Sequence, residues 1–104
     1  MTDVSPIDPR LHVELWTSWA SLLRSYAGAH GLSSPHHAVV EVGPEEIILR
    51  VDTRWLRFTH TGLTSSEGRQ TPFQLEENGT ATFDDANEDM DLLAERLARE
   101  MMSQ

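Results

Sequence analysis

Five histidines are the residues of this 104-residue chain that most directly suggest chemistry, because neutral imidazole is the commonest metal ligand in proteins. His36 and His37 are adjacent, and adjacent side chains of a strand point to opposite faces, so the two do not chelate one ion together. His12 and His30 fall at opposite ends of one predicted helix. At most one of the adjacent pair can join His60, and no HExxH spacing is present. We therefore expect no metal site.

Nucleophilic catalysis finds equally little support in the residue pattern. The chain has no cysteine, which excludes thiolate catalysis, disulfides and cysteine-ligated zinc. The loop serines Ser33, Ser34, Ser65 and Ser66 lie outside any GxSxG sequence, and no local pattern places a base beside them. A site assembled from distant residues stays open, so the sequence leaves an enzyme undecided, with the balance against one. We expect no catalytic residue and no cofactor.

The stretch from Ile48 to His60, ILRVDTRWLRFTH, carries the most unusual combination of side chains. It holds three of the eight arginines, and the chain has no lysine. Trp55 lies among these arginines. Arginine offers a planar fork to carboxylates and aromatic faces, and both residue types are enriched at the energetic centres of protein interfaces. The stretch therefore suggests a binding surface, provided that the fold puts these side chains on one face.

The distribution of charge along the chain indicates which classes of partner can be excluded. The net charge is −9, and residues 76–104 carry nine acids against two arginines, whereas residues 46–70 carry four arginines against three acids. Nucleic-acid binding needs clustered positive charge, so we expect no nucleic acid. No segment approaches the roughly 18 apolar residues of a membrane span, and the first residues lack a signal-peptide pattern. We expect a cytoplasmic protein with no membrane partner.

The first element that could position these side chains is a helix over residues 9–30. Asp8 followed by Pro9 predicts an N-cap and a first helical residue, and Gly31 suits a left-handed C-terminal cap. The apolar and aromatic side chains repeat at helical spacing and form one stripe, which comprises His12, Leu15, Trp16, Trp19, Leu22, Leu23, Tyr26, Ala27 and His30.

Two strands on either side of Gly43-Pro44 predict an antiparallel hairpin with the loop 43–46. After Val51 the apolar alternation changes phase, so one straight strand cannot continue, and a two-residue turn at Asp52-Thr53 restores a uniform inner face. This register aligns the inner residues of three strands: Ala38 with Val51 and Arg54, Val40 with Leu49 and Leu56, and Val42 with Ile47 and Phe58.

The rest of the chain predicts a polar loop over residues 61–68, a second hairpin and a last helix. A three-residue loop, 77–79, with Gly79 left-handed, pairs Phe73 with Phe83 and Leu75 with Ala81. The helix covers residues 86–102, with Asp85 as N-cap. Together these elements predict a two-layer α+β fold in one domain, residues 1–104, with an N-terminal helix, a five-stranded antiparallel meander over residues 36–84 and a C-terminal helix.

The helices of such a fold cover one face of the sheet and leave the outer face open. Trp55 and Arg50 share a row there, which predicts cation–π stacking, and Glu41 and Arg57 flank Ile48 as an expected ion pair. Mixed aromatic, apolar and arginine chemistry of this kind favours an interaction module that forms a homodimer or binds an unidentified protein partner. The alternative is that the N-terminal arm or the loop 61–68 covers Trp55. The expected partner-binding residues are Val39, Glu41, Ile48, Arg50, Trp55 and Arg57.

A second hypothesis is a small-molecule-binding or enzymatic domain. Two helices over a curved sheet can leave a cleft between the layers, which is a common place for ligand pockets. The side chains expected to line that cleft are Trp16, Trp19, Tyr26, Arg54, Phe58 and His60.

Overall fold

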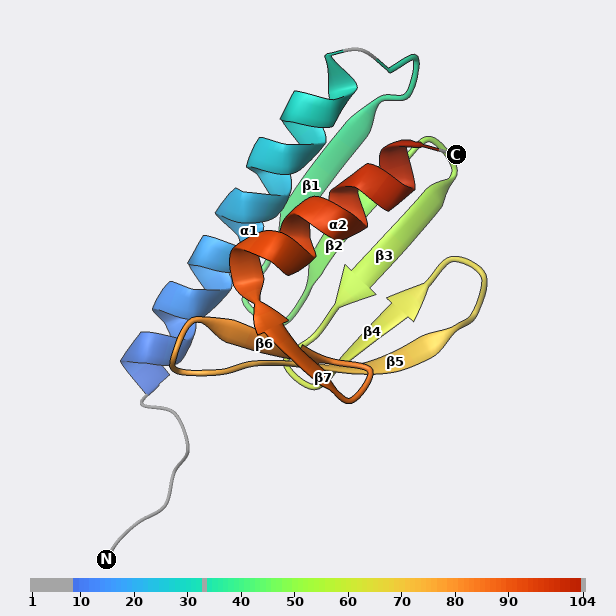
Figure 1. Ribbon diagram of the computed structural model, residues 1–104. Coiled ribbons are helices and arrows are strands. Elements are labelled where there is room, and N and C mark those ends of the chain that lie inside the picture. The colour runs from blue at the N-terminus through green and yellow to red at the C-terminus, as the bar shows by residue number, and fades with distance from the viewer. Residues whose placement is uncertain (1–8, 33, 104) are drawn as a thin grey trace, which may run out of the picture.

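The computed structural model describes residues 9–32 and 34–103, and consists of two helices and seven strands (Figure 1). In chain order the elements are α1 (Pro9–Gly31), β1 (Ala38–Val42), β2 (Ile47–Val51), β3 (Arg54–Phe58), β4 (Gly62–Ser65), β5 (Gln70–Leu75), β6 (Thr80–Phe83), β7 (Ala86–Asp89) and α2 (Met90–Met102). The predicted α+β class, with a helix at each end of an antiparallel sheet, is confirmed.

The strands form one antiparallel sheet in which each strand pairs with its neighbours in the chain, in the order β1 to β7. The predicted count of five strands is wrong, because β4 and β7 were expected to be a loop and the start of a helix. Strand β4 pairs Leu63 with Phe58 of β3 and buries the Leu63 side chain. One apolar residue in a polar segment is too weak a pattern to predict a strand.

The register predicted for the first three strands is confirmed. Val40 pairs with Leu49 and Leu49 with Leu56, so the inner face is continuous across β1, β2 and β3. The turn at Asp52-Thr53 forms as expected, and Asp52 takes a positive φ of 57°. In the second hairpin Phe73 pairs with Phe83, as predicted.

The last helix begins four residues later than predicted. Asp84 and Asp85 both have positive φ, 52° and 68°, and form a tight turn that leads β6 into β7. Asp and Asn are the non-glycine residues that best tolerate this conformation. The observed N-cap is therefore Asp89, whose carboxylate accepts a hydrogen bond from the Asp91 backbone N–H at 2.8 Å, and not Asp85.

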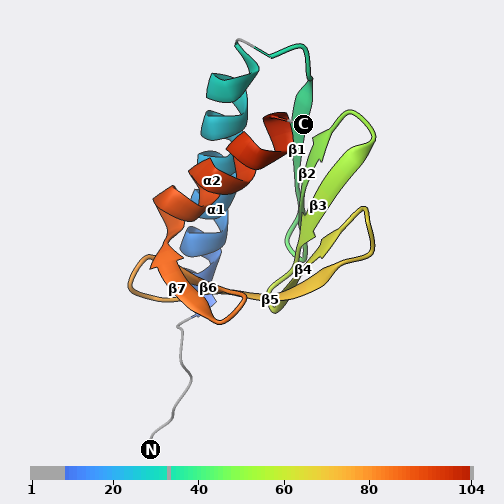
Figure 2. The same cartoon turned by 45° about the vertical axis from the view of Figure 1, so that its right-hand side comes forward.

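Both helices lie on the same side of the sheet, and the last two strands swing under α2 (Figure 2). The centre of the core is an aromatic cluster in which Trp19 lies 5.3 Å from Phe58 and 5.2 Å from Phe73, measured between ring centroids. All three side chains are buried. The cluster ties α1 to strands β3 and β5.

The C-terminal end of α1 differs from the expected capping. Gly31 is the last helical residue and lacks the positive φ of a left-handed cap. The expected N-cap, Asp8, lies outside the described residues. A helix long and apolar enough to cross a bilayer is absent from the part of the chain that the structure describes.

Candidate binding surfaces

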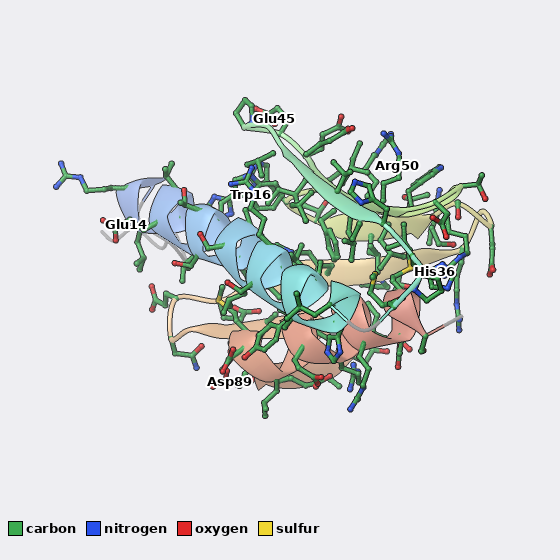
Figure 3. All side chains as sticks on the ribbon, turned by 90° about the horizontal axis from the view of Figure 1, so that it is seen from above. Glu14, Trp16, His36, Glu45, Arg50 and Asp89 are labelled. Atoms are coloured by element: carbon green, nitrogen blue, oxygen red, sulfur yellow. The ribbon has the colours of Figure 1, made fainter. Side chains whose placement is uncertain are left out.

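The outer face of β1, β2 and β3 brings together the six predicted partner-binding residues. Val39, Arg50 and Trp55 form one row across the strands. A second row has Glu41, Ile48 and Arg57. Arg50 lies on the side of the sheet that faces away from both helices (Figure 3).

The charged groups on this face pair differently from the expectation. The Arg50 guanidinium donates to the Glu41 carboxylate at 2.8 Å, and Arg57 lies 3.4 Å from Glu46. The expected Glu41–Arg57 pair does not form. Stacking of Arg50 on Trp55 is also absent from the described residues. Both arginines of the face are thus engaged with carboxylates of the same chain.

Apolar exposure on this face increases towards β1. Val39 is 41% exposed, whereas Ile48 and Trp55 are half-buried. The segment expected to cover Trp55 instead continues the sheet beside it, since the Ser66 backbone N–H donates to the Trp55 carbonyl at 2.9 Å. The N-terminal arm, the other expected cover, lies outside the described residues.

Strand β1 is an edge of the sheet, and its hydrogen-bonding groups alternate in direction. The Gly43 N–H donates to the Glu46 carbonyl, and the Asp52 N–H donates to the His37 carbonyl. The odd-numbered residues of β1 therefore bond β2, and the even-numbered residues Ala38, Val40 and Val42 direct their N–H and C=O groups outward.

The two edges of the sheet carry different side chains. Edge strands of natural proteins are commonly protected by charge, because an apolar edge is a template for pairing with another chain. The β7 edge has the sequence Ala-Asn-Glu-Asp, whereas β1 is Ala-Val-Val-Glu-Val. Val42 is 45% exposed on one face of β1, and Val39 is 41% exposed on the other. The apolar edge of the sheet is β1.

The six residues expected to line a ligand cleft do not line a common one. Trp19 and Phe58 are fully buried in the aromatic cluster. Tyr26 donates a hydrogen bond to Asp91 on the outside of the helix pair. Arg54 lies at the C-terminal end of α2, where its Nη2 donates to the Met101 carbonyl at 2.7 Å.

The remaining two, Trp16 and His60, form an aromatic group with His12 beside the β1–β2 turn. His60 lies 4.3 Å from Trp16 and 4.6 Å from His12 between ring centroids. The Trp16 Nε1–H donates to the Gly43 carbonyl at 2.8 Å, and Figure 3 shows Trp16 between α1 and the strands. Burial, with the nearby His60 as a smaller cause, holds the pKa of His12 below 6.5.

A cleft of about 450 Å³ does exist, on the other side of α2 from α1. We call it the α2 cleft. The C-terminal half of α2 forms one wall, and β3 with the β4–β5 hairpin forms the other. Arg54 is the one predicted ligand-binding residue that reaches it. No sequence signal marked this site, because it depends on β4, which is absent from the sequence-based prediction. Its lining includes Arg54, Leu56, Leu63, Phe83, Arg96 and Leu97.

No group of three or more metal-ligating side chains is placed to hold an ion among residues 9–32 and 34–103. Comparison of the chain with protein-family models, with curated proteins and with solved structures gave no match.

Proposed function

We propose that this protein is an interaction domain that forms a homodimer through the edge of β1. The observation that carries the proposal is the apolar β1 edge, which pairs with no further strand among the described residues and exposes Val39 on one face and Val42 on the other. Addition of a strand to such an edge supplies main-chain hydrogen bonds, and the alternating side chains supply specificity. The expected cytoplasmic location is part of this proposal.

The register that we propose for a second copy of the chain is two-fold, antiparallel and centred on Val40. In that register Val40 pairs with its own copy, Ala38 pairs with Val42, and Val39 pairs with Glu41. The outward N–H and C=O groups of Val40 then bond each other across the axis. No carboxylate lies opposite another, and like charges directly opposite each other would destabilise the pair.

The charge of the chain also favours this edge over the rest of the surface. The chain carries a net charge of −9, so two copies repel each other over most approaches. Near β1 the Glu41 carboxylate is neutralised by Arg50, and Glu46 lies beside Arg57. The β7 edge, with Glu88 and Asp89, would oppose acid to acid.

Mass in solution tests the proposal. Sedimentation equilibrium of the wild type, from micromolar to millimolar concentration, should show a concentration-dependent approach to twice the chain mass of 11.7 kDa. Val42→Lys adds a charge at a position that is already exposed, so it should leave the fold intact and shift the equilibrium to the monomer. Leu92→Lys is the matched control, because Leu92 is 65% exposed on α2, and it should remain dimeric.

Two further variants separate edge pairing from packing through the outer face. Val40→Pro removes an N–H that points away from β2, so it should abolish dimers while the β1–β2 ladder is kept. Trp55→Ala should leave edge dimers intact, whereas it would break dimers that pack face to face. A wild type that is monomeric at all concentrations, or a Val42→Lys variant as dimeric as Leu92→Lys, would overturn the proposal.

A further inference from the structure

At the α2 cleft, part of the inner face of the sheet is not covered by either helix. Leu63 and Leu97 are buried at its base, but Leu56 and Phe83 stay half-buried although their side chains pack against the core. No residue of α1 reaches the cleft. Its volume, about 450 Å³, falls within the range of roughly 300–1,000 Å³ that small-molecule sites occupy.

Two half-buried arginines, Arg54 and Arg96, line the cleft together with this apolar surface. Arg96 is clamped by Glu88 through two hydrogen bonds of 3.1 and 2.7 Å, and its guanidinium carbon lies 6.0 Å from the centroid of the Phe83 ring. Its charge is therefore balanced by the protein. Arg96 forms one fixed side of the cleft.

Arg54 differs because no carboxylate lies within 4 Å of its guanidinium among the described residues. The pKa of the Asp52 carboxyl is lowered chiefly by the hydrogen bond with His36, and only last among the causes by the charge of Arg54. One N–H bonds the Met101 carbonyl at 2.7 Å, and Nη1 lies 4.0 Å from the Met101 sulfur, which is a weak acceptor. A guanidinium has five N–H donors, so several stay available while the carbonyl fixes its position. Arg54 is thus an oriented cation with free donors beside apolar surface.

Acidic side chains also border the cleft, and they are more exposed to solvent than Arg54. Glu67, Asp84 and Glu100 are exposed, whereas Arg54 is half-buried. Water screens the exposed carboxylates more strongly than a partly buried cation. The inner part of the cleft therefore favours an anionic group, and the acids lie at the rim.

We propose that the α2 cleft binds a small organic acid, a molecule with an apolar chain or ring and one carboxylate. The apolar part would pack on Leu56, Leu63 and Leu97, and the carboxylate would accept hydrogen bonds from the free donors of Arg54. Hydrogen bonds between a guanidinium and a carboxylate are among the stronger ones in proteins. The proposal is independent of the homodimer, because it uses neither β1 nor its edge.

Octanoate and 1-octanol form a matched pair of probes, since they share the chain length and only one carries a carboxylate. Titration of each into the ¹⁵N-labelled wild type should shift the amide signals of β3, β4 and the second half of α2 saturably. Octanoate should bind about tenfold more tightly than octanol, as expected for one charge-assisted contact. Signals of β1 and of the first half of α1 should not move.

Two variants and one control test the assignment. Arg54→Gln should reduce the preference for octanoate over octanol to less than about threefold. Leu56→Trp fills the cleft and should abolish binding of both probes. The control Val13→Lys, at a position that is 62% exposed on α1, should bind both as the wild type does. Equal affinity of the wild type for the two probes, or shifts that map elsewhere, would overturn the proposal. Should Leu56→Trp fail to fold, the wild-type shift map and Arg54→Gln still decide it.

Discussion

The two tryptophans of α1 allow the same substitution at two sites that differ in hydrogen bonding. Trp19 is fully buried, and its Nε1–H has no hydrogen-bond partner among the described residues. Trp16 is also buried, but its Nε1–H donates to the Gly43 carbonyl at 2.8 Å. We predict that Trp19→Phe changes the free energy of unfolding far less than Trp16→Phe does.

The magnitudes follow from two terms. Phenylalanine is roughly 40 Å³ smaller than tryptophan, which at about 24 cal/mol per Å³ of cavity costs about 1 kcal/mol. The smaller apolar area costs about another 1 kcal/mol at either site. At Trp19 the substitution also removes an unsatisfied buried donor, a gain of about 2 kcal/mol. At Trp16 it removes a hydrogen bond worth about 1 kcal/mol. The sums are about zero for Trp19→Phe and a loss of about 3 kcal/mol for Trp16→Phe.

Urea unfolding followed by far-ultraviolet circular dichroism measures both changes without relying on tryptophan fluorescence. The slope of free energy against urea should stay the same in the two variants, so that the midpoints report stability alone. A Trp19→Phe variant destabilised as much as Trp16→Phe would refute the reasoning, because it would mean that the Trp19 N–H carries no penalty in the folded protein.

Two further predictions concern pH. The pKa of His12 lies below 6.5 in the folded chain, so the unfolded chain binds the proton more readily, and stability should fall as the pH drops below 6.5. His12→Gln should flatten this dependence in thermal melts across that range, although His60 and Glu45 remain beside the site, and an unchanged slope would contradict the assignment. The pKa of Asp52 is lowered, chiefly by its hydrogen bond with His36, so its stabilisation is present above 3.8 and is lost as the pH falls below that value. Asp52→Asn, which still tolerates the positive φ, should therefore melt lower than the wild type at neutral pH, with a difference that shrinks in acid. A difference that persists undiminished would argue against the role of the hydrogen bond with His36.

The sequence predicted most of the fold where apolar alternation was strong. The phase change after Val51 located the turn at Asp52-Thr53, and that turn fixed the register of β1, β2 and β3. The same reasoning aligned Phe73 with Phe83 in the second hairpin. A one-residue error in register would have put the apolar side chains on the wrong face, so few alternatives were physically acceptable.

The predictions that were wrong concern segments whose structure depends on contacts with residues distant in the sequence. Residues 86–89 have the acids of a helix start, yet they pair with β6 because Asp84 and Asp85 both accept positive φ. Contacts beyond the segment stabilise that choice: Glu88 bonds Arg96 on α2, and the Met90 N–H donates to the Gly79 carbonyl. No local pattern contains such contacts.

On the candidate binding surfaces too, the strand register was predictable from the sequence and the side-chain contacts were not. The backbone register placed the six outer-face residues in the expected rows, but rotamers decided that Arg50, and not Arg57, would pair with Glu41. The α2 cleft could not be predicted from the sequence, because one of its walls is the β4–β5 hairpin. That wall forms only when β4 pairs with β3.

The two proposed sites have separate physical origins. The cleft forms because two helices cover only part of a seven-stranded sheet, and the edge exists because the meander is open. Helices α1 and α2 pack against each other and cover the aromatic cluster, but they leave Leu56 and Phe83 half-buried on the inner face. The two edge strands of the described sheet are β1 and β7, and of these only β7 carries a row of polar side chains. The β1 edge and the α2 cleft lie on different strands, and so a dimer joined at β1 would leave the cleft of each chain open.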